Sequence, residues 1–393
     1  MNQLKNYSTL ALIYFLIIAI LGVVMRLFPI IQISANYKFL VHTHSHVALL
    51  GWVYTALTTL IYLLYLRKSQ IHRHFKNIFI FTQVTIIGML LSFPFIGYAF
   101  FSILFSTLFL IASYLFAWLV FKYTPTELKQ TYSYKLIKIA LWYMIISSIG
   151  PWTLGAIMST LGQGSSLYKN AIYFYLHFQY NGWFLVALLG LFTRILEQQN
   201  IVFSKIEFSI IYWLFNTGVV ATFLISILWM SPSISINGIA GIGSILQLIA
   251  FIIFIKKLND IKLESNQYLL NLFIVFFLIK LIMQLLGCFP YFSSSISYNV
   301  DLVIGYIHWV FLGVVSIGLL SLLSHFKLIK VTKVTITLYT IGFLLTEALL
   351  FYKGTVVWLE LNLNTNYYHY LAGASIILLL SMVRLFILQL KRK

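Results

Sequence analysis

Six of the nine histidines stand in or beside long apolar runs, where an imidazole needs a partner. They are His42, His44, His46, His177, His308 and His369. A polar side chain in hydrocarbon is costly unless something satisfies it. Imidazole is the commonest neutral metal ligand and a frequent axial ligand of haem iron. We therefore expect these six residues to carry the chemistry of the chain, with a metal ion or a haem as their partner.

Other ligand types are scarce, which narrows the choice of metal. The single cysteine, Cys288, excludes Cys-based zinc sites and iron–sulfur clusters, since each needs several thiolates. The c-type haem attachment sequence C-x-x-C-H is absent. Of the eight acidic residues, only Asp301, Glu347 and Glu360 fall near the same membrane side as the six histidines. This donor set favours b-type haem or His-bound copper over calcium or magnesium, which prefer oxygen ligands.

The run HTHSHVALLGWVY, which begins at His42, is the most specific feature. In a helix, His42 and His46 share one face at i,i+4, whereas His44 points elsewhere. Two imidazoles on one face can chelate one metal; alternatively, one binds haem while another hydrogen-bonds it. Gly51 would let a flat macrocycle or another helix approach closely, and Trp52 offers a stacking face. The structural alternative is an interfacial histidine cluster bonded to water and headgroups.

Three further stretches carry one histidine each. In YLHFQYNGWF, His177 shares a helix face with Asn181, and Gln179 adds another polar group. In GYIHWVFLGVVSIG, His308 lies about two turns into its predicted helix. In NYYHYLAG, three tyrosines surround His369. Hydrogen bonds at the interface or between helices are the alternative to ligation in all three stretches.

Three other ionisable residues fall within or at the ends of apolar runs. Arg26 ends the first run, where it could neutralise haem propionates or reach lipid headgroups. Lys280 and Glu347 lie inside later runs, and they either pair with each other or form part of a proton route.

Composition identifies the elements that must position these residues. The chain has 393 residues, of which 61% are hydrophobic and 9% charged. A soluble domain usually carries about 25% charged residues, and disordered chains are poor in apolar ones, so both classes are excluded.

A helix that spans the bilayer needs roughly 20 apolar residues. We predict an all-α, polytopic membrane protein, a single transmembrane domain over residues 1–393 with about twelve spans in the lipid bilayer. The predicted spans are Thr9–Pro29, His44–Leu66, Ile78–Tyr98, Phe100–Phe121, Leu136–Ser159, Ala171–Thr193, Phe208–Met230, Ile236–Ile255, Tyr268–Cys288, Val300–Leu323, Thr335–Phe351 and Tyr368–Leu390.

The basic residues predict the orientation. The net charge is +18, but Lys and Arg sit in short loops between apolar runs, so nucleic acid is not an expected partner. With the N-terminus in the cytoplasm, 21 of the 26 basic residues face that side, four face the other, and one lies within a span. Both termini are therefore predicted to be cytoplasmic, in a bacterial-type inner (plasma) membrane. In this topology every even-numbered span begins on the outer side, so the six candidate histidines gather in the outer half of the membrane.

These features resemble the haem–copper oxidase subunit I superfamily. The resemblance lies in about twelve helices, an inner N-terminus, and histidines on the second, sixth and tenth helices. The segment HSHVALLGWV, from His44 to Val53, is also similar to a motif of small and divergent oxidase-subunit-I-like membrane proteins. The helix pattern covers nearly the whole chain, whereas the short motifs cover about thirty residues. The implied fold is an oxidase-like bundle.

The resemblance also implies a cofactor and its ligands. In the family, the second and tenth helices bind haem and the sixth and seventh hold copper, toward the outer side. Carried over to this chain, His46 and His308 become the axial pair of a haem b, with Arg26 beside it. His42, His44 and His177 become ligands of a second metal, copper, or hydrogen-bond partners of the haem, and His369 is an additional, unassigned metal candidate. The chain departs from the family in two places, because Phe208–Met230 lacks histidine and His308 is followed by Trp309 and Val310.

The leading functional prediction is a b-type haem protein, with or without copper, in electron transfer or in the binding or reduction of O2 or NO. A redox subunit or a cytochrome is the implied partner. Whether the chain is an enzyme stays open; if so, it is an oxidoreductase of the terminal oxidase or NO reductase type without the full copper site. The alternative is transition-metal (copper) transport or handling, with the outer histidine triplet as the entry site.

A transporter of organic solutes is a third interpretation. It would need helix breaks at corresponding positions in two halves of the chain. Only Gly150-Pro151, where we predict a kink, and Phe93-Pro94 qualify.

Overall fold

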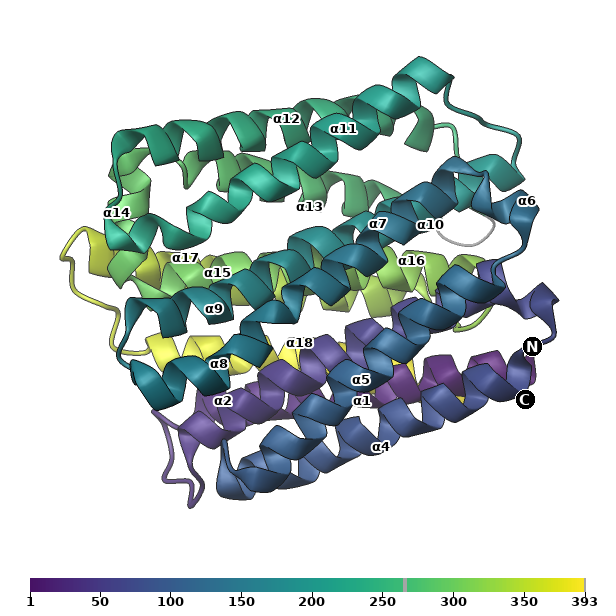
Figure 1. Cartoon of the computed structure of the whole chain (residues 1–393). Coiled ribbons are helices and arrows are strands. Elements are labelled where there is room, and N and C mark those ends of the chain that lie inside the picture. Colours follow the sequence, from purple (N-terminus) through teal and green to yellow (C-terminus); the bar gives the residue numbers. More distant parts are fainter. Residues whose placement is uncertain (264–266, 392–393) are drawn as a thin grey trace. The chain divides into compact units, whose positions relative to one another are not determined.

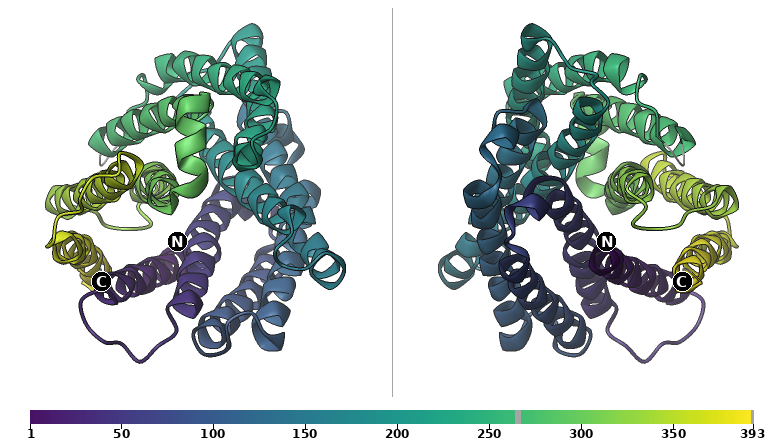
Figure 2. Two further views of the ribbon diagram at one scale, coloured as in Figure 1. Left: turned by 90° about the vertical axis from the view of Figure 1, so that its left-hand side faces the viewer. Right: turned by 90° about the vertical axis from the view of Figure 1, so that its right-hand side faces the viewer.

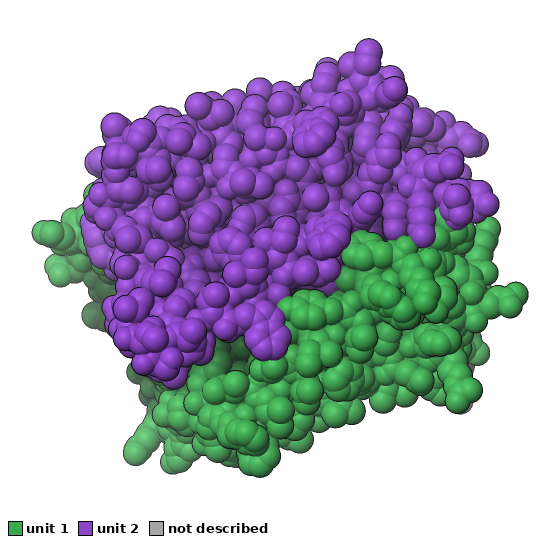
Figure 3. Space-filling model, viewed as in Figure 1, with its two compact units in different colours: residues 1–125, 319–393 green, residues 126–318 purple. Residues whose placement is uncertain are grey.

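The computed structural model describes residues 1–263 and 267–391, and these residues form helices and loops without strands (Figure 1). The all-α prediction is therefore confirmed. The chain divides into two compact units, residues 1–125 with 319–393 (unit 1) and residues 126–318 (unit 2) (Figure 3). The single transmembrane domain over residues 1–393 stays a prediction.

Unit 1 contains the first and last helices of the chain. Its elements are α1 (Asn2–Leu27), α2 (Tyr37–His46), η1 (Val47–Tyr54), α3 (Thr55–Ile61), η2 (Tyr62–Leu66), η3 (Arg67–Ser69), α4 (His72–Ile96), α5 (Phe100–Tyr123), α17 (Lys333–Trp358) and α18 (Tyr367–Leu390). Helices α1 and α18 pack along each other (Figure 2), and the start of α1 and the end of α18 lie at the same end of this unit (Figure 1).

Unit 2 contains the middle of the chain. Its elements are α6 (Thr126–Lys129), α7 (Tyr132–Ser147), α8 (Ile149–Thr160), α9 (Ser166–His177), η4 (Phe178–Phe184), α10 (Leu185–Gln198), α11 (Lys205–Thr222), η5 (Phe223–Met230), α12 (Ile234–Leu258), α13 (Gln267–Leu286), α14 (Pro290–Tyr298), α15 (Val300–His308) and η6 (Trp309–Ser316). The helix α16 (Ile317–His325) continues from η6 across the boundary into unit 1.

Eleven helical stretches in the described part of the chain are long and apolar enough to cross a membrane. They correspond to eleven of the twelve predicted spans, so the helical prediction is confirmed and these helices could span a membrane. The remaining predicted span, Ala171–Thr193, lies in the helical run formed by α9, η4 and α10, which is not among the eleven. This run carries His177, Gln179 and Asn181, three polar residues that lower its mean hydropathy. Buried polar residues thus make this helix less hydrophobic than the other predicted spans.

The same four-helix order occurs three times along the described chain. The third and fourth helices of each group pack together as the pairs α4–α5, α11–α12 and α17–α18 (Figure 1). The first helix of each group packs against the middle of the second, giving the contacts α1–η1, α7–η4 and α13–η6. Each of these contacts lies within one unit.

The kink predicted at Gly150-Pro151 is confirmed. The helix ends at Ser147 and a new one begins at Ile149, with Ser148 between them. Proline cannot donate a backbone hydrogen bond and its ring collides with the preceding turn, so the break falls just before Pro151. By contrast, Pro94 lies inside α4. This helix is capped three residues later by Gly97, which has a positive φ.

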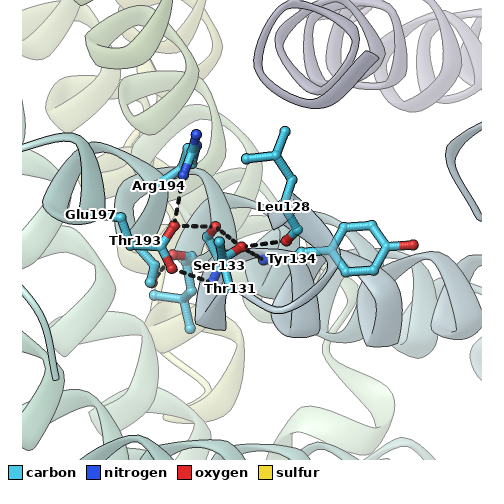
Figure 4. Close-up of polar contacts among 8 residues, drawn as sticks. Leu128, Thr131, Ser133, Tyr134, Thr193, Arg194 and Glu197 are labelled. Carbon is cyan, nitrogen blue, oxygen red and sulfur yellow. Dashed lines mark hydrogen bonds and ion pairs between the residues drawn. The ribbon is translucent and has the colours of Figure 1, made fainter. Parts of the chain in front are cut away.

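A carboxylate joins the ends of α7 and α10 (Figure 4). Glu197 accepts hydrogen bonds from the backbone N–H of Ser133 at 2.9 Å and from its hydroxyl at 2.6 Å, and it pairs with Arg194 at 3.2 Å. Ser133 lies in the first turn of α7, where backbone N–H groups lack helical partners and a negative charge is favourable. Glu197 therefore acts as an N-terminal cap supplied by another helix.

Replacing Glu197 with alanine is expected to lower the free energy of unfolding by about 1–2 kcal/mol, the cost of losing a helix cap. Thermal unfolding in mild detergent would measure it. Glu127→Ala, at an exposed glutamate of the same unit, is the matched control and should change stability little. Equal melting temperatures for both variants would contradict the capping role.

Candidate functional site

Three π-helical segments begin immediately after a candidate histidine. They are η1 after His46, η4 after His177, and η6 after His308. A fourth and shorter one, η2, is the only other π-helical segment among residues 1–263 and 267–391. π-helical turns are rare and occur frequently at functional sites, because they change which side chains share a face. Their repeated position beside histidine marks these three stretches as the candidate site.

The three stretches also share a sequence pattern. Each reads H-x4-G, as His46 to Gly51, His177 to Gly182, and His308 to Gly313. The interval from His46 to His177 is 131 residues, and His308 follows after another 131. The pattern falls on the second helix of each four-helix group, so the three histidines are structurally equivalent positions of one internal repeat. The spacing of 131 residues is a sequence signal of this equivalence.

The glycines of this pattern allow the first helix of each group to approach. A Cβ on Gly51 would lie 2.9 Å from Cγ of Tyr14 on α1. A Cβ on Gly182 would lie 2.6 Å from Cγ of Tyr143 on α7. Close approach of another helix, one of two predicted roles for Gly51, is therefore confirmed. The stacking face of Trp52 is occupied by Phe15 of α1, with ring centroids 4.5 Å apart.

Gly182→Ala is expected to lower the free energy of unfolding by about 1–3 kcal/mol, because the new methyl group overpacks against the Tyr143 ring. Gly155→Ala on α8 is the matched control, since a Cβ there meets nothing within 4 Å. Removing a helical glycine should stabilise that control by up to about 1 kcal/mol. Shifts of the same sign in the two melting temperatures would contradict tight packing at Gly182.

His46 is held in one tautomer by its own helix. Its Nδ1 lies 2.8 Å from the carbonyl oxygen of His42, and since a carbonyl only accepts, Nδ1 carries the proton. In neutral imidazole the lone pair is then on Nε2. Nε2 lies 3.4 Å from the hydroxyl of Tyr98, a long distance for a hydrogen bond. Ligand histidines commonly have this arrangement, with one nitrogen bonded to a carbonyl and the other able to bind metal.

His42 and His46 both lie against aromatic rings of α4 and of the loop that follows it. The His46 ring lies 4.4 Å from that of Phe93 on α4, and the His42 ring lies 4.6 Å from that of Tyr98. Tyr98 is 55% exposed, in the short loop between α4 and α5. The His42/His46 face predicted from i,i+4 spacing is thus confirmed.

His44 faces another part of unit 1. Its ring hydrogen-bonds the backbone of Ile18 and approaches Gly22, both on α1. Arg26, half-buried near the end of α1, interacts electrostatically with His44 and with the buried Glu347 of α17. The histidine triplet is therefore split, with His44 toward α1 and the other two toward α4. In the described ranges no three His, Cys, Asp or Glu side chains gather into a metal-binding group.

His177 makes two protein contacts inside unit 2. Its Nε2 donates to the carbonyl oxygen of Val219 at 2.9 Å, and its Nδ1 accepts from Nδ2 of Asn181 at 3.1 Å. The side chain is 2% exposed. A metal at His177 would have to displace one of these partners. Its assignment as a copper ligand stays a prediction.

A chain of buried polar groups extends from Asn181. Its Oδ1 accepts from Nζ of Lys280 at 2.6 Å, and Lys280 also donates to Oε1 of Gln284 at 2.5 Å. Gln284 continues the chain to Gln247 at 2.8 Å, and Gln247 lies 3.4 Å from the hydroxyl of Thr222. Lys280, Gln247 and Thr222 have exposed fractions of 0%. The network that contains Lys280 thus connects η4, α13, α12 and α11 of unit 2.

The sequence predicts that Lys280 either pairs with Glu347 or forms part of a proton route, and this network of hydrogen bonds bears on both predictions. The hydrogen bonds of its Nζ go to two neutral amides of unit 2. Glu347 belongs to unit 1 and interacts with Arg26. A structural network of amides was not among the sequence expectations, because Lys280 and Asn181 are 99 residues apart.

The two remaining candidate histidines are more exposed than His177. His308 is half-buried at the end of α15, in unit 2. His369 is exposed in the first turn of α18, in unit 1. Their assignments, to haem and to a metal, stay predictions.

No known protein-family model matches the chain, and no curated protein matches it in sequence. The candidate site therefore has to be interpreted from its own residues.

Proposed function

We propose that the chain is a membrane-embedded b-type haem protein in which His46 supplies an axial ligand. The single observation that supports this most is the tautomer of His46, whose Nδ1 is bonded to the His42 carbonyl and whose Nε2 keeps its lone pair. The π-helical turn that starts at Val47 and the aromatic ring of Phe93 beside the imidazole are typical of a functional site in apolar surroundings.

The second axial ligand is proposed from the family resemblance. His308 occupies the same H-x4-G position of the third group that His46 occupies in the first. His177 occupies this position in the second group, but both of its ring nitrogens have protein partners. The choice of His308 rests on the resemblance, in which the tenth helix supplies a haem ligand.

A haem iron exchanges single electrons or binds a diatomic gas, depending on whether both axial positions are filled by protein. With His46 and His308 as ligands no position stays open, so we propose electron transfer, with a redox subunit or cytochrome as partner. Arg26 is the cation we propose for a haem carboxylate. Arg26 also interacts with the buried Glu347, so its positive charge would be shared between the haem carboxylate and Glu347.

Copper handling is less well supported. A copper site formed by the whole triplet would require His42, His44 and His46 to share one ion, whereas His44 hydrogen-bonds α1 and His46 lies against Phe93 of α4. A His177 copper site would require breaking an existing hydrogen bond.

The second ligand can be tested with His308→Ala. We expect the purified variant to lose the low-spin bis-histidine absorption spectrum of the wild type and to shift its Soret band when carbon monoxide is added. His369→Ala, at an exposed histidine of the first turn of α18, should leave the spectrum unchanged. An unaltered low-spin spectrum in His308→Ala would exclude His308 as the ligand.

A further inference from the structure

A groove on unit 1 lies between α1 and α4, away from the candidate histidines. It encloses about 460 Å³, within the range of about 300–1,000 Å³ typical of ligand pockets. Its floor is formed where the two helices touch: the rings of Tyr7 and Phe79 lie 4.0 Å apart, and the Tyr14 hydroxyl donates to Gln83 at 2.9 Å. Because Tyr7 faces Phe79 and Tyr14 faces Gln83, the helices run in the same direction along the groove.

One end of the groove is polar and positively charged. Gln3 and Asn6 from the start of α1 and Lys76 from the start of α4 line it. Residues 1–125 contain no aspartate or glutamate, whereas Lys5, Arg67, Lys68, Arg73 and Lys76 all belong to the segments at this end of unit 1. Any partner that neutralises this charge has to come from outside residues 1–125.

Apart from Gln83, the rest of the groove is lined mainly by apolar side chains and faces outward. Leu10, Ile80, Val84 and Ile87 line it, and Ile80 and Val84 are 49% and 54% exposed. From Lys76 to Ile87 the helix rises about 16 Å, over eleven steps of about 1.5 Å each. That length is about half of the ~30 Å hydrocarbon core of a bilayer. The groove therefore has the depth of one leaflet, with its charged end at headgroup level.

We propose that this groove is a binding site for one anionic phospholipid. The phosphate lies at Lys76, where the amide of Asn6 can donate a hydrogen bond, as can the second N–H of Gln3, whose Nε2 also donates to the Tyr7 hydroxyl at 2.6 Å. One acyl chain follows the apolar wall to Ile87. Basic pockets between transmembrane helices bind anionic headgroups in this way. A neutral isoprenoid quinone would fill the apolar part but leave Lys76 without a counter-charge.

Native mass spectrometry of the full-length, delipidated protein in mild detergent can test the site, with phosphatidylglycerol and phosphatidylcholine as probes. Two variants address its two ends. Lys76→Gln removes the charge, and Val84→Trp fills the apolar groove. Lys333→Gln, at the start of α17, and Leu91→Trp, at an exposed position of α4, are the matched controls outside the groove.

We expect wild type and both controls to retain one phosphatidylglycerol in preference to phosphatidylcholine. In Lys76→Gln the bound fraction should fall about fivefold, which corresponds to ~1 kcal/mol per basic residue at a membrane surface. In Val84→Trp binding of both lipids should fall. Equal binding of the two lipids by wild type, unchanged binding in both groove variants, or a retained quinone that phosphatidylglycerol does not displace would each overturn the proposal.

Discussion

Lys280→Ala is expected to lower the free energy of unfolding by about 2–5 kcal/mol. The change removes the donor to Oδ1 of Asn181 and to Oε1 of Gln284. Both residues are buried, with exposed fractions of 2% and 4%. Each buried acceptor left without a donor costs about 1–3 kcal/mol. Unfolding by a denaturing detergent, followed by tryptophan fluorescence, would measure the loss.

Two further variants separate this network from a simple loss of volume. Lys256→Ala, at an exposed lysine of α12, should change stability by less than about 0.5 kcal/mol. In a double-mutant cycle, Lys280→Met combined with Asn181→Leu should cost less than the sum of the single changes, because no acceptor is then left behind on Asn181. Interhelical hydrogen bonds in membranes average about 0.6 kcal/mol, so a total loss below about 1 kcal/mol would show that Lys280 is not the centre of the network.

His46→Ala is expected to reduce the haem content of the purified protein more than tenfold. Mutating even the hydrogen-bond partners of a metal ligand typically costs 10–100-fold in affinity, and the ligand itself should cost at least as much. The ratio of haem to protein, from pyridine haemochrome absorbance, measures the effect.

His42→Ala is the matched control for this variant. The hydrogen bond that orients His46 goes to the backbone carbonyl of His42, and alanine keeps that carbonyl. His42→Ala should therefore retain most of its haem. An equal loss in both variants, or a loss in His42→Ala alone, would contradict the assignment of His46.

The helical framework could be predicted from sequence because hydrophobic length alone determines it. The runs that became α1, α4 and α5 are long and apolar, and each folds as one helix. The break before Pro151 follows from local backbone chemistry. Position and length predict a span within Ser166–Gln198, although its polar residues make its mean hydropathy lower than that of the other spans.

The candidate site was predictable only in part. The common face of His42 and His46 follows from helical spacing. Periodicity could not show that His44 bonds Ile18 on α1 or that His177 bonds Val219, since those partners come from other helices. The π-helical turns also depend on tertiary packing, although the repeated H-x4-G spacing marks where they occur.

The most direct test of the central claim is the absorption spectrum of the purified wild-type protein, with iron and copper measured on the same sample. The proposed function predicts a Soret band, haem b extracted without covalent attachment, and about one iron per chain. A protein that is folded, as judged by circular dichroism, but lacks a Soret band and contains no iron would contradict it.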